Sequence, residues 1–455
     1  MKPSIPKGTR DFSPKEVIRR DYIFDTVRQV FRLYGYQPIE TPAMENLSTL
    51  LGKYGEDGDK LIYRILNSGD FLSGVSDREL LGRETAKLSA VICERGLRYD
   101  LTVPFARYVV QNRDKIIFPF RRYQIQPVWR ADRPQKGRYR EFSQCDVDII
   151  GSNSLLNEYE LVRIIDDVFK RLKISIEIRI NNRKILSGIA EIIGESAKIT
   201  DITVTIDKLE KVGPDAVNQE LKDRGVSDAA IKKLQPVINL KGTTGEKLAR
   251  LKGIIAGSET GIQGVSEMKT LFSFIESSPS ADIAGLDLTL ARGLDYYTGA
   301  IIEVRSKDVR IGSICGGGRY DNLTGVFGLE GISGVGVSFG ADRIYDVLDQ
   351  TNLFDDIKGS GTQVLILNFG EKEVMYGIGI QNKLKEIRVS SEVYPDPVKL
   401  KKQMSYADAR KIPYIIIAGD EEIKSNVLTL KIMSSGEQKK MSPDELISFF
   451  KSFHF

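Results

Sequence analysis

The hydrophobic positions near the N-terminus follow the spacing of an amphipathic helix. Over residues 15–33 apolar side chains recur every three or four positions, at Val17, Ile18, Tyr22, Val27, Val30 and Phe31. Ser13 and Pro14 precede this run and Gly35 follows it, as is usual at the two ends of a helix. The pattern therefore predicts a helix over residues 15–33.

From about residue 97 to residue 151 the pattern becomes that of strands. The stretches LRYDLTV, FRRYQIQPVWRA and REFSQCDVDIIG are rich in β-branched and aromatic residues, and loops rich in Arg, Pro and Gly separate them. We expect these stretches to pair in an antiparallel sheet. Residues 155–173 then show helical spacing, and the strand ISIEIRI follows.

The rest of the chain divides into regions of different texture. Residues 183–280 consist of short, charged, mostly helical pieces, which we interpret as an insertion. Strand patterns return in LDLTLARGLDYYTGAIIEVRS, a Gly-rich turn GSICGGGRYDN follows, and GVGVSFGADRIYDVLDQ predicts a strand that leads into a helix. The tail alternates strands and helices, which is typical of a small α/β domain. The predicted boundaries are 1–182 and 281–350 for a two-part core, 183–280 for the insertion, 351–360 for a linker and 361–455 for the small domain.

Composition narrows the class of protein. The 455 residues are 41% hydrophobic, which fits a globular chain of several units and excludes collagen-like and disordered classes. The 66 basic and 62 acidic residues give a net charge of only +4, so a basic surface for nucleic acid would have to be local. No apolar run approaches the ~20 residues that span a bilayer, and the first residues lack the apolar core of a secretory signal. We therefore expect a cytoplasmic protein without membrane contact.

Cysteine and histidine usage excludes several kinds of chemistry. Cys93, Cys145 and Cys315 lie far apart, which excludes a disulfide scaffold and a CxxC zinc site. The only histidine is His454, one residue from the end, so a Ser-His-Asp relay and a histidine-ligated metal are disfavoured. Chemistry in this chain has to use carboxylates, arginines, tyrosines or a cofactor.

A cationic loop lies between two of the predicted strands. The segment WRADRPQKGRYREF carries five cations around a Pro/Gly turn, namely Arg130, Arg133, Lys136, Arg138 and Arg140. Arginine offers a planar fork of donors and stays charged, so such a loop can clamp a polyphosphate. The alternative is a solvated hairpin tip.

Polar side chains alternate along the neighbouring strands. Phe142, Gln144, Asp146 and Asp148 fall on one face at period two, as expected for a pocket floor. Upstream, Asp100 and Thr102 share a face of the predicted strand LRYDLTV in the same way and offer acceptors for an ammonium or imidazole N–H. The alternative for these two is solvent exposure on an edge strand.

Two further segments hold candidate site residues. ARGLDYYTG combines Arg292 with Asp295, Tyr296 and Tyr297; buried in a cleft, the arginine could stabilise a developing negative charge, although a structural Arg–Asp pair is the alternative. Arg343 lies at a predicted helix start, where phosphate binding and helix capping are both open. The Gly-rich turn matches neither GxxxxGK[ST] nor GxGxxG, which disfavours P-loop and Rossmann nucleotide binding.

Taken in order, these segments resemble the histidyl-tRNA synthetase family over nearly the whole chain. The N-terminal segment of the family resembles KGTRDFSP. Its class II motifs 1, 2 and 3 resemble GYQPIETP with Pro42, VWRADRPQKGRYREF and GVGVSFGADRI, in that order. Its two histidine-specific segments resemble LRYDLTVP and ARGLDYYTG. The implied fold is α+β: a class II antiparallel sheet core with flanking helices, a mainly helical insertion and a C-terminal α/β anticodon-binding domain.

The resemblance implies that ATP activates L-histidine to histidyl-adenylate with loss of diphosphate, and that histidine then passes to the 3′ end of tRNA(His). Arg130 and Arg292 would be catalytic, contacting the α-phosphate from two sides. Phe142 would stack on adenine, and Arg138 and Arg343 would hold the outer phosphates. Mg²⁺ would accompany ATP, on protein ligands that the sequence does not name.

Further roles follow from the same resemblance. Asp100, Thr102 and Gln144 would receive the α-ammonium of histidine. Asp148 and Tyr297 would hold its imidazole nitrogens, with Tyr296 adjoining. Arg130 would bridge the carboxylate and the α-phosphate, and Leu101 and Arg292 are also expected to bind histidine. Gln135 and Lys136 would contact the tRNA acceptor end, and motif 1 would build a homodimer. A basic patch in the C-terminal domain would bind tRNA phosphates, although a solvated helix face is the alternative for its members, Lys399, Lys401, Lys402, Arg410 and Lys411.

Two rival functions share part of this pattern. A regulatory paralogue that controls the first enzyme of histidine biosynthesis would lack the anticodon domain and parts of the signatures. Here Arg130, Gln144, Asp148, Arg292 and Arg343 are present and residues 360–455 are retained, which disfavours that function. A class II synthetase for proline or threonine conflicts with RGLDYYTG and, for threonine, with the absence of zinc ligands.

Overall fold

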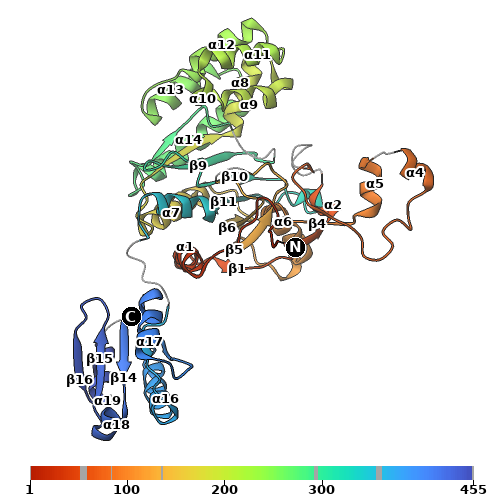
Figure 1. The fold of residues 1–455 in the computed structure, drawn as a ribbon. Coiled ribbons are helices and arrows are strands. Elements are labelled where there is room, and N and C mark those ends of the chain that lie inside the picture. The colour runs from red at the N-terminus through yellow and green to blue at the C-terminus, as the bar shows by residue number, and fades with distance from the viewer. Residues whose placement is uncertain are drawn as a thin grey trace. The chain divides into compact units, whose positions relative to one another are not determined.

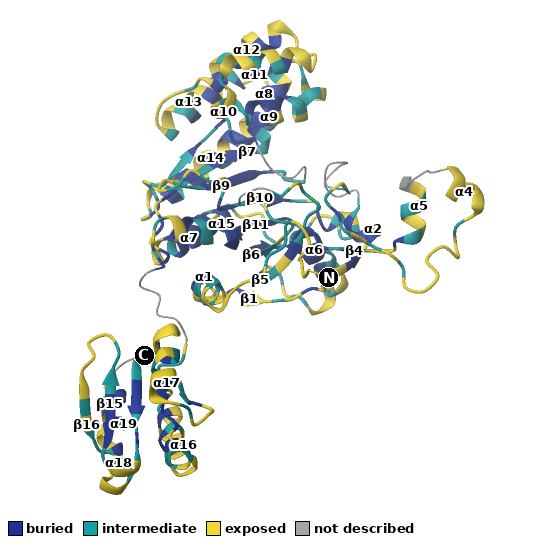
Figure 2. Ribbon diagram, in the orientation of Figure 1, coloured by how far each residue is buried: buried dark blue, intermediate teal, exposed yellow. Residues whose placement is uncertain are grey.

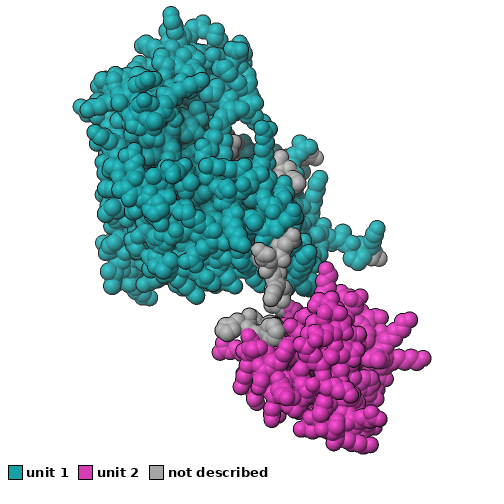
Figure 3. All heavy atoms as spheres, turned by 90° about the vertical axis from the view of Figure 1, so that its left-hand side faces the viewer, with its two compact units in different colours: residues 1–356 teal, residues 357–455 magenta. Residues whose placement is uncertain are grey.

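The computed structural model describes residues 2–51, 59–82, 85–134, 137–291, 296–354 and 361–452. The chain divides into two compact units, Met1–Asp356 and Ile357–Phe455, drawn in different colours in Figure 3. The division falls inside the segment that the sequence predicts to be a linker. Each unit has its own sheet and core.

Unit 1 is built on an eight-stranded sheet (Figure 1). The strand order is β1 (Gln37–Pro38), β5 (Phe120–Trp129), β6 (Glu141–Ile150), β11 (Gly334–Gly340), β10 (Cys315–Tyr320), β9 (Ala300–Ser306), β7 (Ile176–Asn182) and β8 (Ala284–Leu286). The outermost pairs, β1–β5 and β7–β8, are parallel and the pairs between them are antiparallel. The predicted antiparallel core is confirmed, with parallel strands at its two edges.

One face of this sheet is covered by helices α1 (Pro14–Leu33), α7 (Leu156–Arg171) and α15 (Ala341–Gln350). The predicted N-terminal helix is confirmed: Ser13 and Glu16 form a capping box at its start, and Phe31 packs against Tyr123 of β5 and Phe339 of β11. Because side chains alternate along a strand, Arg122 points to the opposite face, where Phe105 of α6 (Thr102–Gln111) lies 4.2 Å from its guanidinium carbon.

Beside α6 lies a smaller antiparallel sheet. It consists of β2 (Met44–Asn46), β4 (Arg95–Leu97) and β3 (Arg64–Ile65), with the short helices α2 (Leu47–Leu50), α4 (Asp77–Gly82) and α5 (Thr85–Ile92) nearby in the sequence. LRYDLTV is therefore not the strand that the sequence suggests. Only its first residue, Leu97, belongs to β4, and α6 begins at Thr102.

The segment predicted as an insertion is helical in the structure. It contains α8 (Arg183–Ile193), α9 (Ile199–Ile206), α10 (Leu209–Val212), α11 (Pro214–Asp223), α12 (Asp228–Ile238), α13 (Thr244–Ile254) and α14 (Glu259–Glu276). Glycines let α8 and α14 approach closely, because a Cβ on Gly188 would lie 2.5 Å from the Cα of Gly261. Short 3₁₀ turns occur at Arg113–Lys115, Ser196–Lys198 and Gly325–Phe327.

The Gly-rich segment GSICGGGRYDN contains a strand rather than only a turn. Residues 315–320 form β10 between β9 and β11, and this region of the sheet is largely buried (Figure 2). A Cβ on Gly317 would lie 2.0 Å from the carbonyl oxygen of Gly336, and one on Gly318 would lie 2.5 Å from that of Ala300. The glycines are thus required by close strand packing, a use that composition does not distinguish from a turn.

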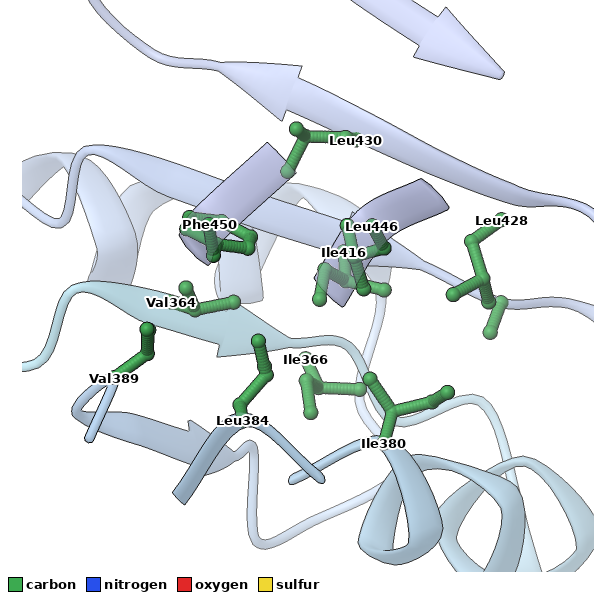
Figure 4. Packing of buried hydrophobic residues seen from close by; sticks show 11 residues of the cluster. Val364, Ile366, Ile380, Leu384, Val389, Ile416, Leu428, Leu430, Leu446 and Phe450 are labelled. Atoms are coloured by element: carbon green, nitrogen blue, oxygen red, sulfur yellow. The ribbon is translucent and has the colours of Figure 1, made fainter. Parts of the chain in front are cut away.

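Unit 2 has a five-stranded sheet with helices on both faces. The strand order is β13 (Ser391–Val393), β12 (Val364–Ile366), β14 (Tyr414–Ile417), β15 (Leu428–Ile432) and β16 (Gln438–Met441), and the helices are α16 (Glu371–Glu386), α17 (Leu400–Ala409), α18 (Asp420–Ser425) and α19 (Pro443–Lys451). Val364 and Ile366 of β12 join the core that includes Leu446 and Phe450 (Figure 4). Leu365 of β12 joins a second core, in keeping with a period of two.

No helix among the described residues is both long and apolar enough to cross a membrane.

Candidate active site

A cavity of about 330 Å³ opens over β6, β10, β11 and the start of α15 in unit 1. The side chains that line it include five of the predicted site residues, namely Arg130, Arg138, Phe142, Gln144 and Arg343. These five come from two separate parts of the sequence, residues 130–144 and Arg343, and the fold brings the two parts together. Three of the five are cations, and the lining also contains the carboxylates of Asp132 and Asp342.

Arg130 is held at the cavity by its backbone and its side chain. It follows the last residue of β5, its backbone N–H donates to the carbonyl of Arg140, and its Nε donates to the carbonyl of Tyr99 at 2.9 Å. Its guanidinium carbon lies 5.1 Å from the centre of the Phe142 ring. The contact with Tyr99 uses only Nε, so it leaves the two terminal nitrogens of the guanidinium for an anion in the cavity.

The two other cations are fixed differently. Arg138 pairs with Asp132 at 2.7 Å, and its side chain is half exposed. Arg343 lies in the first turn of α15, and it donates to the carbonyls of Gly137 and Ser313 at 3.2 and 2.6 Å. A helix N-terminus adds positive potential there. The predicted helix start at Arg343 is confirmed.

Residues of the N-terminal segment contact Asp342 and Tyr139, which also line the cavity. Asp342 of α15 accepts from Arg10 and Arg20, each at 2.5 Å, and from the backbone N–H of Ser143. The guanidinium carbon of Arg10 lies 3.3 Å from the centre of the Tyr139 ring. These contacts join the segment KGTRDFSP to α15 and to the start of β6.

Asp100, Leu101 and Thr102 lie at the junction between β4 and α6. Asp100 and Leu101 are buried, and one oxygen of Asp100 accepts from the backbone N–H of Val103 at 3.3 Å. Its other oxygen has no hydrogen-bond partner among the described residues. Burial raises the pKa of Asp100 to about 7, although Arg130 opposes the shift. The expectation that Asp100 and Thr102 share a strand face is wrong, because this segment is a loop that enters a helix.

Gln144 lies on the floor of the cavity, on the face of β6 that also carries Asp146 and Asp148. Its amide N–H donates to Ser338 of β11 at 2.8 Å, and its carbonyl oxygen is buried with no hydrogen-bond partner in the described structure. An orphaned acceptor beside the cavity suits a bound N–H donor.

Asp148 accepts one hydrogen bond, on Oδ1, and its Oδ2 lies beside a cation but has no hydrogen-bond partner among the described residues. Tyr320 of β10 donates to Oδ1 at 2.7 Å, and the fully buried guanidinium of Arg122 lies 2.8 Å from Oδ2. Gly336 makes room for this carboxylate, because a Cβ there would lie 2.0 Å from Oδ1. Burial raises the pKa of Asp148, and Arg122 opposes that shift.

The two tyrosines of ARGLDYYTG stand near these carboxylates. The Tyr296 and Tyr297 rings meet at 4.8 Å between centres, and Tyr296 also packs edge-on against Tyr320. Burial raises the pKa of Tyr297, and Asp148, Asp146 and Asp100 all add to the shift by their charges. Four predicted residues of this site, Gln135, Lys136, Arg292 and Asp295, lie outside the described residues.

Three supporting residues were missed by the sequence interpretation. Arg122 and Tyr320 hold Asp148, and Arg98 is buried at the entry to the histidine segment. Arg98 donates to the carbonyls of Thr41, Pro42 and Pro127 and to Gln126, and so ties motif 1 to β5. The signal for Arg122 was present, because polar residues alternate along FRRYQIQ as they do along β6.

Comparison with known proteins agrees with this geometry. A model of the histidyl-tRNA synthetase family matches residues 92–344, and a model of the anticodon-binding domain matches residues 363–453. The chain is 61% identical over 446 residues to a histidine–tRNA ligase of Bacteroides fragilis (strain YCH46), covering 98% of each chain. It is 57% identical over 444 residues to the histidine–tRNA ligase of Porphyromonas gingivalis (strain ATCC BAA-308 / W83), again covering 98% of each.

A solved structure extends the agreement to the fold. The histidyl-tRNA synthetase from Nostoc sp. PCC 7120 superposes with a TM-score of 0.83 at 30% identity, and the match covers 99% of each chain. The resemblance predicted from the sequence motifs is confirmed by these matches over the full length. The chain belongs to the histidyl-tRNA synthetase family of class II aminoacyl-tRNA synthetases.

Proposed function

We propose that this histidine–tRNA ligase forms histidyl-adenylate in the 330 Å³ cavity of unit 1 and transfers the histidine to tRNA(His). The observation that carries the assignment is the convergence of Arg130, Phe142, Gln144 and Arg343 on that one cavity. An aromatic ring, fixed guanidinium groups and a buried amide suit adenine, phosphates and an amino acid respectively.

Activation in this site is a matter of positioning and charge. The histidine carboxylate attacks the α-phosphorus of ATP, the bond to the diphosphate breaks, and no proton has to move. Both reactants are anions, so a fixed guanidinium between them lowers the barrier by stabilising the charge that accumulates on the α-phosphate. We assign that role to Arg130, whose Nε is anchored on Tyr99, and we assign Arg292 to the opposite side of the phosphate.

We assign the remaining polar and aromatic groups to the binding of ATP or of histidine. Phe142 is placed to stack on adenine, with Arg138 and Arg343 at the outer phosphates. Asp100, Leu101, Thr102 and Gln144 are assigned to the α-ammonium, which supplies the N–H donors that the buried acceptors of Asp100 and Gln144 lack. Tyr296, Tyr297 and the carboxylates of β6 are assigned to the imidazole.

Magnesium is expected to accompany ATP. Among the described residues no group of three or more His, Cys, Asp and Glu side chains is placed to hold a metal ion. We therefore assign Mg²⁺ to the phosphates of the nucleotide, where it would neutralise charge on the departing diphosphate.

Unit 2 is proposed to bind the anticodon arm. Lys401 and Lys402 on α17 are exposed, and neither pairs with an acidic side chain in the described part of the chain, so they suit phosphate contacts. Arg410 pairs with Glu392 at 2.9 Å, which makes it a weaker candidate. Several expectations stay predictions: phosphate contacts of Lys399 and Lys411, acceptor-end contacts of Gln135 and Lys136, the homodimer and the cytoplasmic location.

The test is histidine-dependent ATP–diphosphate exchange, measured with each of the twenty amino acids in turn. We expect exchange with histidine alone. Exchange with another amino acid would overturn the assignment of the amino-acid site, and no exchange by folded protein with Mg²⁺ would overturn the proposed activation reaction.

A further inference from the structure

The N-terminal segment contacts the base of the cationic loop between β5 and β6. The backbone N–H of Arg140 donates to the carbonyl of Gly8 at 2.9 Å, and the carbonyl of Arg140 accepts from the backbone N–H of Arg130 at 2.8 Å. The side chain of Arg140 also donates to the carbonyls of Lys7 and Asp132, at 3.2 and 3.0 Å. Arg140 therefore links the N-terminal segment to Arg130 by hydrogen bonds.

A tight turn lets the segment approach the loop this closely. Gly8 has a φ of +91°, and a Cβ on it would lie 2.8 Å from the Cγ of Pro134. Thr9 donates its backbone N–H and its hydroxyl to the carbonyl of Pro6, at 3.2 and 2.8 Å. The turn fixes the chain directly before Arg10.

Arg10 joins two walls of the cavity. Its guanidinium carbon lies 3.3 Å from the centre of the Tyr139 ring, and its Nη2 donates to the Oδ1 of Asp342 at 2.5 Å. Tyr139 and Asp342 both line the cavity, one from the cationic loop and the other from the first turn of α15. The side chain of Asp342 is 5% exposed, so its charge depends on paired cations. A planar guanidinium can stack on the ring and donate to the carboxylate at the same time.

The two residues that Arg10 joins are neighbours in sequence of the two arginines proposed for the outer phosphates. Arg138 precedes Tyr139, and Arg343 follows Asp342. Arg343 also donates to a backbone carbonyl of the cationic loop at 3.2 Å, which is a second contact between the same walls. Because Arg10 contacts both walls, it limits how far Arg138 and Arg343 can move apart.

Arg20 shares the carboxylate but does not repeat this bridge. It donates to the Oδ1 of Asp342 at 2.5 Å, and its guanidinium carbon lies 4.1 Å from the centre of the Phe12 ring. Removal of Arg10 therefore leaves a cation beside Asp342, so the buried carboxylate keeps a partner while the link between the walls is lost.

We infer that Arg10 is a positioning residue for the triphosphate of ATP, because it sets the separation of Arg138 and Arg343 by joining Tyr139 to Asp342. This inference rests on the proposed activation reaction and deepens it. AMP has no outer phosphates, so its binding does not use this separation. ATP and diphosphate both carry the outer phosphates, and their binding should depend on Arg10.

The test measures Arg10→Ala and Arg10→Lys in the full chain. The readouts are KM for ATP and for diphosphate in histidine-dependent exchange, the inhibition constant of AMP, and the dissociation constant of histidine from calorimetry. We expect Arg10→Ala to raise both KM values about 10-fold, the effect of losing one charged hydrogen bond, and to leave AMP and histidine nearly unchanged. Arg10→Lys keeps the charge without the planar fork, so its KM values should lie between those of Arg10→Ala and the parent.

Arg19→Ala is the matched control. Arg19 of α1 pairs with Asp349 at 2.7 Å, so it also joins the N-terminal part of the chain to α15, but near the end of that helix remote from Arg343. This variant should keep the parental KM values.

Three outcomes overturn the inference: parental KM values in Arg10→Ala, an equal loss of affinity for AMP or histidine in that variant, or the same rise of KM in Arg19→Ala. If Arg10→Ala does not fold, the same readouts on Arg10→Lys decide, and parental KM values there overturn the inference. Absence of histidine-dependent exchange in the parent is a different result, which overturns the proposed function and the inference together.

Discussion

At the scale of single residues, Asp100 illustrates a conflict between stability and binding. Burial raises its pKa to about 7, whereas an aspartate in an unfolded chain titrates at about 4. The folded chain therefore holds the proton more tightly, and this group's contribution to stability is lost as the pH rises from about 4 to about 7. The amide of Asp100→Asn does not ionise over this range, so the variant does not lose stability in this way as the pH rises.

We expect Asp100→Asn to be more stable than the parent, and by a larger margin at pH 8 than at pH 5. Melting temperatures at the two pH values measure this, and calorimetry on the same samples should show weaker histidine binding, because a carboxylate opposite the ammonium is gone. An advantage that is the same at both pH values would contradict the raised pKa.

Arg130 carries the most specific chemical assignment. In Arg130→Lys the charge remains but the planar fork and the Nε–H contact to Tyr99 are lost. We expect the rate of diphosphate exchange at saturating substrates to fall about 100-fold and the dissociation constant of histidine to change far less. Exchange kinetics and calorimetry separate the two effects, and a variant with the parental rate would show that Arg130 is not at the transition state.

The site could be predicted from sequence only where a side chain's role follows from its own segment. The alternation of Phe142, Gln144, Asp146 and Asp148 on β6 was readable, since period two fixes a shared face. The contact from Tyr320 to Asp148 was not, because Tyr320 lies 172 residues further along the chain, whereas Arg122 lies opposite Asp148 on the preceding strand β5.

At the scale of elements, strand β11 passes beside Asp148 at Gly336, where the space for a side chain is taken by the carboxylate. A Cβ on Gly336 would lie 2.0 Å from the Oδ1 of Asp148 and 2.8 Å from the carbonyl oxygen of Val147. Because Asp148 is held by two buried partners, it cannot move aside freely. We expect Gly336→Ala to lower the free energy of unfolding by about 1–3 kcal/mol and to weaken histidine binding.

Gly340 at the end of the same strand provides the control. Its added Cβ would meet only the carbonyl oxygen of Ile314, at 3.6 Å, which is an ordinary contact. Gly340→Ala should therefore leave the urea midpoint within a small margin of the parent. Equal destabilisation by the two substitutions would mean that strand glycines matter for a reason other than the Asp148 contact.

Element prediction succeeded where one periodicity dominated and failed where glycine was ambiguous. The helix α1 was readable because Val27, Val30 and Phe31 repeat at helical spacing and all three are buried. β10 was taken for a turn, because Gly316, Gly317 and Gly318 carry no side-chain pattern. Their use in a strand depends on the backbones of β9 and β11, which the segment itself does not encode.

At the scale of the whole molecule, the proposed activation site and the proposed anticodon site lie in different units. The cavity residues all belong to Met1–Asp356, and Ile357–Phe455 has its own buried core, which includes Leu446 and Phe450 of α19. The described clusters of buried residues each draw their side chains from one unit, so removal of the second unit should leave the first folded.

A chain of residues 1–356 should therefore keep histidine-dependent diphosphate exchange while its kcat/KM for charging tRNA(His) falls at least about 100-fold, an effect of losing phosphate contacts. The double substitution Lys401→Ala and Lys402→Ala in the full chain is a milder test. We expect unchanged diphosphate exchange and a lower affinity for tRNA. The affinity should also depend less steeply on salt, because fewer counterions are released on binding. If the truncated, folded chain lost exchange as well, activation would depend on the second unit, and the two reactions could not be assigned to separate parts of the molecule.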